Sequence, residues 1–490
     1  MARAGDTRRS MLRKALLGAG AAMAYAGGVL PDVAIAAGLG KAPSGKRPDI
    51  VIFIADDLSW TDIGPNGSKD ARTPNIDRLA REGTRFARAF AASPTCTPSR
   101  SALLTGDYPM RNGAHANHSN IFDTVRTMPA YLKALGYRVV VAGKTDFGPP
   151  RDFPFEYLPG STIHPDGKKR QALLSRLDTQ VVDELFATRD PETPLALFVA
   201  SFQPHVPWAK TPTYDPAALT LPENFVDTPQ MREDFARYLT DVTDLDRELG
   251  EVRGSIAKHG KADDTLFVFT VDHGAQLPFA KWTLYDPGIH IPLIAAWPGR
   301  VPAGRSTEAM VSLTDVLPTM LEAAGAPSPQ GIDGKSFLPV LTGEEDTFRD
   351  HVFAAHTGDK HFNRSPMRAI RTDRWKLIVN LNSSEPYINA MTNAKESRAF
   401  WASWVEQAKT DARAAELVNR YQHRPPLELY DIVADPYELH NLADDPAHAQ
   451  TLATLKARIG QWRIAQGEKL TDVPMPEDAR FGTHFYADWR

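Results

Sequence analysis

The chain contains almost no cysteine: Cys96 is the only one among 490 residues. A single thiol forms no internal disulfide, and it is too little for a metal site built from several thiolates. The remaining structural role for Cys96 is that its side chain packs as a small buried apolar group. The residues around it, Ser-Pro-Thr-Cys-Thr-Pro-Ser-Arg at 93–100, are polar and turn-forming, which favours a chemical role instead.

The chain also lacks a strong charge of one sign. Its formal net charge is -4, so we expect no nucleic-acid partner and no attraction to an anionic membrane. An apolar stretch at residues 15–30 is rich in Ala and Gly and shorter than the ~20 residues that span a bilayer, so we expect no stable membrane span. A hydrophobic content of 42% is ordinary for a soluble globular protein.

The N-terminus has the features of an export signal. Arg8 and Arg9 form a twin-arginine pattern, the apolar stretch follows, and the small residues at 34–36 offer a cleavage site. We expect residues 1–36 to be a signal peptide for the twin-arginine translocase, and the protein to be periplasmic or secreted. A membrane anchor is the alternative. We expect the folded part of the chain to begin after about residue 46.

Four continuous apolar runs predict strands that are buried on both faces, as in a parallel sheet. They are residues 50–54, 139–142, 195–200 and 266–271. Helices are predicted between them, each ended by a glycine. They cover residues 75–83, 128–135 and 235–249. Alternating strands and helices indicate a doubly wound α/β domain, which we place at residues 47–345.

The C-terminal part has a different pattern. Residues 367–379 predict a hairpin, residues 427–431 a further strand, and residues 447–465 an amphipathic helix. We therefore expect a small antiparallel sheet with one packed helix, in a second α+β subdomain at residues 346–490.

Polar residues of catalytic types follow each of the four predicted strands. They are Asp56 and Asp57, Lys144, His205, and Asp272 with His273. Ligands of parallel α/β sheets bind at the carboxyl ends of strands, so these side chains are expected to share one pocket. The carboxylates suit a hard divalent cation such as Ca²⁺ or Mg²⁺, and the histidine shifts the choice a little toward Mn²⁺ or Zn²⁺.

The residues from Cys96 onward, Cys-Thr-Pro-Ser-Arg and then Ser-Ala-Leu-Leu-Thr-Gly up to 106, resemble the signature of the sulfatase family. The resemblance extends from residue 48 to about 462. It implies an alkaline-phosphatase-like fold: a doubly wound mixed sheet with a smaller C-terminal antiparallel sheet plus helix. It also implies that a maturation enzyme oxidises Cys96 to formylglycine, whose hydrated aldehyde is the nucleophile for hydrolysis of a sulfate ester or sulfamate.

The resemblance also assigns roles to site residues. The implied metal ligands are Asp56, Asp57, Asp272, His273 and residue 96 itself, with Ca²⁺ the commonest metal. Arg100 would fix the metal carboxylates or the hydrate, Lys144 would contact sulfate, and Lys281 and His205 would steady the leaving oxygen, one of them protonating it.

Within the family, residues 111–118 and 276–279 resemble the heparan N-sulfatase (N-sulfoglucosamine sulfohydrolase) group. This likeness implies a small sulfated saccharide as the substrate. His115, Asn117 and His118 are candidates to line the sugar pocket.

One position departs from the family pattern. The family reads Gly-Lys-x-His at the second strand end, where this chain has Gly-Lys-Thr-Asp with Asp146 last. An ionised carboxylate ~4 Å from bound sulfate would repel it by about 4 kcal/mol at an effective dielectric constant of ~20. Three interpretations stay open: Asp146 is the base that deprotonates the hydrate, it has turned away to a structural role, or the protein is slow, specialised or altered here.

Other functions are compatible with the same residues. A phosphodiesterase or phosphonate monoester hydrolase on the same fold is one, because sulfate and phosphate esters share tetrahedral geometry. A catalytically weak sugar-binding protein is a second, suggested by Asp146 alone. A hydrolase that uses the unmodified Cys96 thiol is less favoured, since no His-Asp partner set is evident apart from the metal residues.

Overall fold

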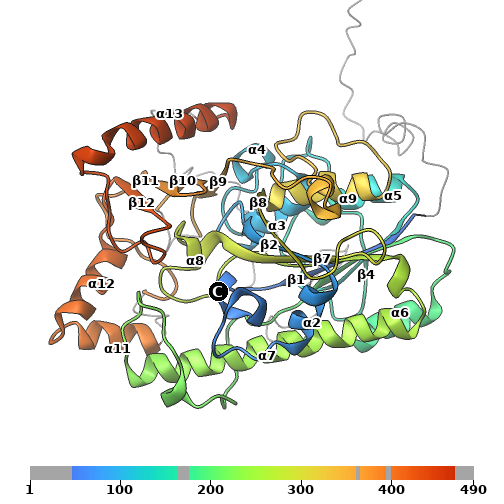
Figure 1. The fold of residues 1–490 in the computed structure, drawn as a ribbon, viewed down its shortest axis with the longest axis horizontal. Helices are drawn as coiled ribbons and strands as arrows, with labels where there is room; N and C mark the ends of the chain where they lie inside the picture. Colours follow the sequence, from blue (N-terminus) through green and yellow to red (C-terminus); the bar gives the residue numbers. More distant parts are fainter. Residues whose placement is uncertain (1–46, 163–175, 360–364, 393–398, 469–490) are drawn as a thin grey trace, which may run out of the picture.

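The computed structural model describes residues 47–162, 176–359, 365–392 and 399–468, so the predicted signal at 1–36 lies outside the described part. A large mixed sheet with helices on both faces lies beside a smaller antiparallel sheet (Figure 1). Within the described part, no helix combines the length and the apolar character needed to cross a membrane.

The large sheet has eight strands. In spatial order they are β4 (Glu156–Tyr157), β3 (Arg138–Gly143), β5 (Leu195–Ala200), β1 (Asp49–Ala55), β6 (Thr265–Val271), β7 (His290–Ala296), β2 (Thr84–Phe90) and β8 (Arg305–Ser312). The first five are mutually parallel, β7 is antiparallel to both neighbours, and β2 is parallel to β8. The four predicted strands are confirmed as the adjacent set β3, β5, β1 and β6, and the predicted mixed sheet is confirmed with them.

The sequence analysis did not find β2, β4, β7 and β8. Strand β2 has the sequence TRFARAF, in which two arginines interrupt the apolar residues, and only part of it is fully buried. Strand β8 likewise has exposed polar residues in its first half. Strands β2 and β8 lie toward one edge of the sheet and are only partly buried, so they lack the continuous apolar pattern that revealed the central strands.

Helices cover both faces of the large sheet (Figure 1). On one face lie α2 (Pro74–Glu82), α6 (Gln180–Thr188) and α7 (Pro229–Lys258), and α7 contacts both of the others. On the other face lie α3 (Cys96–Thr105), α5 (Met128–Ala134) and α9 (Val316–Ala323). The short helices α4 (Pro109–Asn112), α8 (Asp286–Ile289) and α10 (Leu338–Thr342) complete this part.

Helix α7 corrects one prediction, because it does not end at Gly250. It begins after Thr228, whose hydroxyl accepts a hydrogen bond from the amide of Met231, and it runs on through Gly250 and Gly254. A Cβ atom at Gly250 would lie 2.6 Å from the side chain of Asn75. This glycine therefore serves close packing of α7 against α2 rather than helix termination.

The C-terminal part contains the predicted antiparallel sheet, here with four strands. In spatial order they are β12 (Leu427–Asp431), β11 (Trp375–Asn380), β10 (Met367–Thr372) and β9 (His351–His356). The predicted hairpin is β10–β11, and the predicted helix is α13 (Ala449–Ala465), which packs on β10 and β11. Two further helices, α11 (Ala399–Gln407) and α12 (Ala412–Gln422), were not predicted; α11 packs against α7.

A buried ion network joins the two sheets. Asp286 of α8 pairs with Arg371 at 3.1 Å and with Lys376, and Lys376 also pairs with Glu438 at 2.9 Å. The hydrophobic core also continues from the large sheet to residues such as Trp404. The domain boundary near residue 345 stays a prediction, and the contacts across it are extensive.

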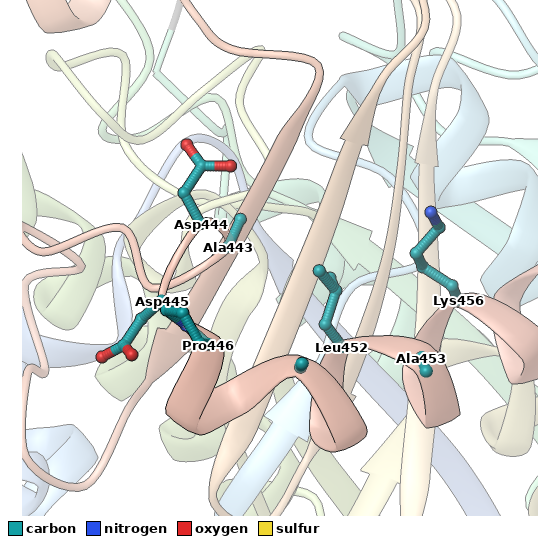
Figure 2. A pocket seen from close by; sticks show the side chains of 8 residues that line it. Ala443, Asp444, Asp445, Pro446, Leu452, Ala453 and Lys456 are labelled. Atoms are coloured by element: carbon teal, nitrogen blue, oxygen red, sulfur yellow. The ribbon is translucent and has the colours of Figure 1, made fainter.

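A shallow hollow of about 220 Å³ lies on the outside of the C-terminal part, between the turn at 443–446 and α13 (Figure 2). Its lining includes Asp444, Asp445 and Lys456, and none of the predicted site residues. It therefore has no part in the site described next.

Candidate active site

Cys96 is the first residue of helix α3, and its side chain is buried. Its Sγ atom lies 3.3 Å from Nε2 of His273, 3.4 Å from Nζ of Lys144 and 3.9 Å from Oδ1 of Asp56. Amides at a helix N-terminus favour a nearby anion. The residue with the predicted chemistry therefore lies among side chains from three different strand ends.

Lys144 reaches this point because β3 ends in a glycine. Gly143 has a φ of +88°, and a Cβ atom there would lie 2.0 Å from the carbonyl oxygen of Ala200. Only glycine fits this close approach. The Lys144 ammonium then contacts both oxygens of Asp56, at 2.8 and 2.6 Å.

Arg100 lies one helical turn after Cys96 and holds two carboxylates. Its Nε donates to Asp272 at 2.9 Å and its Nη2 donates to Asp56 at 3.2 Å. All of these groups are buried, so the paired charges are held in place with little competition from water. Arg100 thus sets the distance between the ends of β1 and β6.

On the other side of Cys96, Asp57 contacts three nitrogen groups. Its carboxylate lies 2.7 Å from Nζ of Lys281, 3.5 Å from Nε2 of His273 and 3.7 Å from Nε2 of His205. The structure therefore brings together nine of the predicted residues around one point. They are Asp56, Asp57, Cys96, Arg100, Lys144, His205, Asp272, His273 and Lys281.

Backbone strain is concentrated in and around this site. Among the described residues, five that are not glycine have a positive φ, and four of them are Asp57, His118, Phe279 and Trp282. Such conformations cost about 1–3 kcal/mol each and persist where the surroundings enforce them. Asp57 belongs to the site itself and Trp282 follows Lys281 directly, so the strain marks a functional centre.

Burial and neighbouring charges set the protonation of the site. Burial raises the pKa of the Cys96 thiol well above its ordinary value, despite Lys144 and Lys281 nearby. Burial would also raise the pKa of Asp56, but Lys144, His205 and Arg100 outweigh it and hold that pKa well below its usual range. Burial lowers the pKa of His205 to about 4. The unmodified thiol is therefore a poor nucleophile at neutral pH, and His205 is neutral.

The donor atoms fit a divalent cation. One donor atom each from Asp57, Cys96 and His273 lie within 4.8 Å of one another, as do those of Asp56, Cys96 and Asp272. Two ligands that are each 2.3–2.6 Å from one Ca²⁺ ion can be at most about 5 Å apart. Sulfur is a soft ligand, so an oxygen at position 96 would suit a hard cation better than the thiol does.

Asp146 lies beside this site and has not turned away from it. Its carboxylate lies 3.8 Å from Nζ of Lys144 and 3.9 Å from Nδ1 of His118. Burial would raise the pKa of Asp146, but His118 and Lys144 outweigh it and lower that pKa. Asp146 is therefore a carboxylate beside the Lys144 ammonium and the His118 imidazole, and it is a weak proton acceptor.

The three predicted sugar-pocket residues are placed differently. Asn117 and His118 adjoin the site: Oδ1 of Asn117 accepts a hydrogen bond from the amide of Thr97, the residue after Cys96. His115 has a pKa lowered to about 4 by burial, and its charged neighbours are Arg368 and Glu468 of the C-terminal part. The role of His115 stays a prediction.

Sequence reasoning missed two residues next to the site, Trp282 and Asp359. The indole Nε1 of Trp282 donates to Oδ2 of Asp359 at 2.8 Å. Trp282 could have been found as the neighbour of Lys281. Asp359 follows no predicted strand, so no signal in the sequence pointed to it.

Comparison with known proteins decides the family. The family model described as Sulfatase matches residues 48–326, more than half of the chain. The chain belongs to the sulfatase family, whose members are sulfuric ester hydrolases. A second family model, N-sulphoglucosamine sulphohydrolase, C-terminal, matches residues 273–397, which confirms the predicted likeness to that group.

Named sulfatases align with most of this chain. An ulvan-active sulfatase of Formosa agariphila is 30% identical over 436 residues, covering 87% of this chain and 82% of its own. Human N-sulphoglucosamine sulphohydrolase is 29% identical over 465 residues, covering 85% and 90%.

Solved structures confirm the fold of this sulfatase. One is a protein in complex with its substrate D-glucosamine-2-N,6-O-disulfate, with a TM-score of 0.66 and 21% identity over 86% of this chain and 98% of that one. A phosphonate monoester hydrolase from Silicibacter pomeroyi also has a TM-score of 0.66 and 21% identity, over 86% and 96%. At this identity the likeness shows a common fold.

Proposed function

We propose that this protein hydrolyses sulfate esters or sulfamates of a sulfated carbohydrate, by means of formylglycine at position 96 and a divalent cation. The observation that carries the proposal is the position of Cys96, whose Sγ atom lies within 3.9 Å of Asp56, Lys144 and His273. The names of the relatives, an ulvan-active sulfatase and an N-sulphoglucosamine sulphohydrolase, support a sulfated saccharide as the substrate.

The proposed metal ligands are the acids and the histidine at the ends of β1 and β6, together with residue 96. They are Asp56, Asp57, Asp272 and His273. When bound, a divalent cation withdraws electron density from the hydroxyl of residue 96 and from a sulfate oxygen. We expect Ca²⁺, with Mn²⁺ or Mg²⁺ as alternatives.

The charges of the site fit a sulfate monoester. The site holds the carboxylates of Asp56, Asp57, Asp272 and Asp146 and the cations of Arg100, Lys144 and Lys281. These three cations, together with a bound divalent cation, offset the carboxylates and attract the negatively charged sulfate group. Lys144 and Lys281 then bind sulfate oxygens as well as their carboxylates.

Departure of the alcohol or amine needs a proton. As one oxygen of the formylglycine hydrate forms a bond to sulfur, the bond from sulfur to the leaving atom breaks and its electron pair stays with that atom. The second hydroxyl of the hydrate then loses its proton, and sulfate leaves with the attacking oxygen, which regenerates the aldehyde. The candidates to donate the proton to the leaving atom are the Lys281 ammonium and the His205 imidazole, which both face Asp57. A positioned acid of this kind contributes about 10²–10⁴-fold to the rate.

The mass of the peptide that contains Cys96 tests the proposal together with turnover. We expect a fraction of the protein in which sulfur is replaced by an aldehyde oxygen, and hydrolysis of 4-nitrophenyl sulfate in proportion to that fraction. Bis(4-nitrophenyl) phosphate tests the alternative, a phosphodiesterase or phosphonate monoester hydrolase. Faster turnover of the phosphate diester, or full turnover by unconverted protein, would contradict the proposal.

We also propose export by the twin-arginine translocase to the periplasm or beyond. Arg8 and Arg9 support this, and export in the folded state suits a cysteine that must be converted first. Replacing both arginines by lysine should keep the protein, with its N-terminus intact, in the cytoplasm. Export of that variant would contradict the proposal.

A further inference from the structure

Asp359 is a buried carboxylate in the turn after β9, and it is 4% exposed. Its Oδ2 atom accepts hydrogen bonds from Nε1 of Trp282 at 2.8 Å and from Nδ2 of Asn117 at 3.0 Å. Its Oδ1 atom lies 3.6 Å from Nε2 of His118 and has no hydrogen-bond partner among the residues that the structure describes. A buried charge is costly unless it is paired, so this arrangement needs a reason.

Two of the three partners lead directly to the reacting groups. Trp282 follows Lys281, whose ammonium contacts Asp57 at 2.7 Å. Asn117 accepts a hydrogen bond from the amide of Thr97, at the start of the helix that carries Cys96. Asp359 therefore fixes both the loop of Lys281 and a contact of the nucleophile's helix through a single oxygen atom.

The third partner leads to the opposite side of the site. The imidazole of His118 lies between Asp359 and Asp146, with one nitrogen toward each carboxylate. Asp146 in turn lies 3.8 Å from Nζ of Lys144. The carboxylate of Asp359 is thus connected to the Lys144 ammonium through the imidazole of His118 and the carboxylate of Asp146.

The backbone around Asp359 needs this support. Trp282 and His118 both have a positive φ, of 67° and 66°. The carbonyl oxygen of Gly358 accepts a hydrogen bond from the amide of Asn117 at 3.0 Å, which ties the same turn to the loop of His118. Two strained residues next to the site are therefore attached to one point in the C-terminal part.

We propose that Asp359 is a positioning residue for sulfate cleavage. It holds Trp282, Asn117 and His118 so that Lys281, Cys96 and Lys144 converge on the same sulfate group. The inference rests on the proposed function and adds a requirement to it: the catalytic geometry is set from the C-terminal part of the chain. A misplacement of about 1 Å at a reacting centre can cost about 10²-fold in rate.

Two substitutions separate the hydrogen bonds of Asp359 from its charge. Asp359→Ala removes both, and we expect kcat/KM to fall about 100-fold. Asp359→Asn leaves one oxygen that can accept both bonds but removes the charge opposite His118, and we expect a loss of about 10-fold. Rates are expressed per folded, formylglycine-containing molecule, so a loss of folding or conversion does not enter the comparison.

A second measurement does not depend on turnover. Inorganic sulfate should raise the melting temperature of the unsubstituted protein, and Asp359→Ala should reduce this increase, because Lys144 and Lys281 no longer converge. Trp282→Phe removes the indole N–H and, as a single substitution, should lower kcat/KM. Added to Asp359→Ala, it should lower kcat/KM further by less than twofold. A purely structural role would not produce this loss of additivity.

Asp246 provides a matched control. It is 2% exposed and accepts hydrogen bonds from the amides of Asn75 and Ile76 at the start of α2, away from the site. Asp246→Ala should lower the melting temperature and leave kcat/KM per folded molecule within twofold. The proposal requires that Asp359→Ala lowers kcat/KM per folded molecule more than Asp246→Ala does, and not only the melting temperature.

The outcomes distinguish the two proposals. If Asp359→Ala keeps kcat/KM per folded molecule and the sulfate-induced increase in melting temperature, the inference is overturned while the proposed function stands. If the unsubstituted protein binds sulfate without cleaving sulfate esters, the proposed function fails, and the melting temperatures still decide the role of Asp359. If it neither binds sulfate nor cleaves its esters, both are overturned.

Discussion

Asp49 and Asp56 lie at opposite ends of the same buried strand, β1, and each pairs with a cation: Asp49 with Arg189 at 2.5 Å and Asp56 with Lys144 at 2.6 Å. They are equally buried, at 4% and 1% exposed. Only Asp56 lies at the carboxyl end of the strand, beside Cys96. This pair of residues contrasts a buried carboxylate in a structural ion pair with one that we propose as a metal ligand.

Removal of divalent cations should abolish turnover, and Ca²⁺ should restore it and raise the melting temperature, because a ligand that binds the folded state stabilises it. Asp56→Asn should eliminate the effect of Ca²⁺ on the melting temperature. Asp49→Asn should lower the melting temperature itself and keep the full effect of Ca²⁺. Thermal unfolding with and without chelator measures both, and an equal response of the two variants would argue against the metal site.

Replacement of Cys96 by alanine should lower kcat by at least about 10⁴-fold, because the nucleophile is lost. The folded protein should remain, since the thiol is small and accepts no hydrogen bond that the fold requires. Turnover of 4-nitrophenyl sulfate and the melting temperature give the two readouts. Residual activity above about one hundredth of the original would show that another group attacks sulfur.

Asp146→Asn should lower KM for a sulfate ester, because it removes a negative charge near the bound anion, and kcat should stay within about 10-fold. Asp146→His tests the interpretation of Asp146 as a base, which its lowered pKa disfavours. The same change to asparagine at the exposed Asp123 is the control and should alter neither constant. A loss of kcat beyond about 10³-fold in Asp146→Asn would restore the base interpretation.

Glu248 of α7 predicts a pH dependence of stability. Burial raises its pKa from 4.5 to about 7, although Ser201 and the amide of Leu177 donate to it. Between pH 4.5 and 7 the folded state therefore binds more protons at this residue than the unfolded state does, so stability falls as pH rises through this range, by roughly 3 kcal/mol.

Glu248→Gln should remove this part of the pH dependence and raise the melting temperature at pH 8 relative to pH 5. Its amide can donate to the hydroxyl of Ser201 in place of the protonated acid. Glu251→Gln, on the exposed side of the same helix, is the control and should leave the pH profile unchanged. Parallel profiles for the unsubstituted protein and Glu248→Gln would contradict the prediction.

The centre of the fold was predictable because burial on both faces leaves a pattern that is visible in a single strand. Residues 50–54 and 266–271 are continuous apolar runs, and they became β1 and β6. In strand β2 two arginines interrupt the apolar residues, and this strand was missed. Gly250 was misinterpreted because a glycine that ends a helix and one that admits a neighbouring helix look the same in sequence.

The site residues also fall into those that the sequence predicts and those that it does not. Asp56, Asp272 and His273 were found because they directly follow predicted strands, and a parallel sheet brings strand ends together. Asp359 lies in a turn more than 80 residues after His273, and it reaches the site because the C-terminal sheet packs against the large one. Such packing between distant segments leaves no periodic signal.

A buried ion network limits how this chain can be shortened or joined to a segment of a relative. It consists of Asp286, Arg371, Lys376 and Glu438. A chain shortened near residue 345 would leave Asp286 as an uncompensated buried charge. A chimera that takes its C-terminal segment from a relative would need to inherit the cations that face Asp286 and the acid that faces Trp282. An exchange of whole segments to change substrate preference therefore has to preserve the paired charges between the large sheet and the C-terminal part.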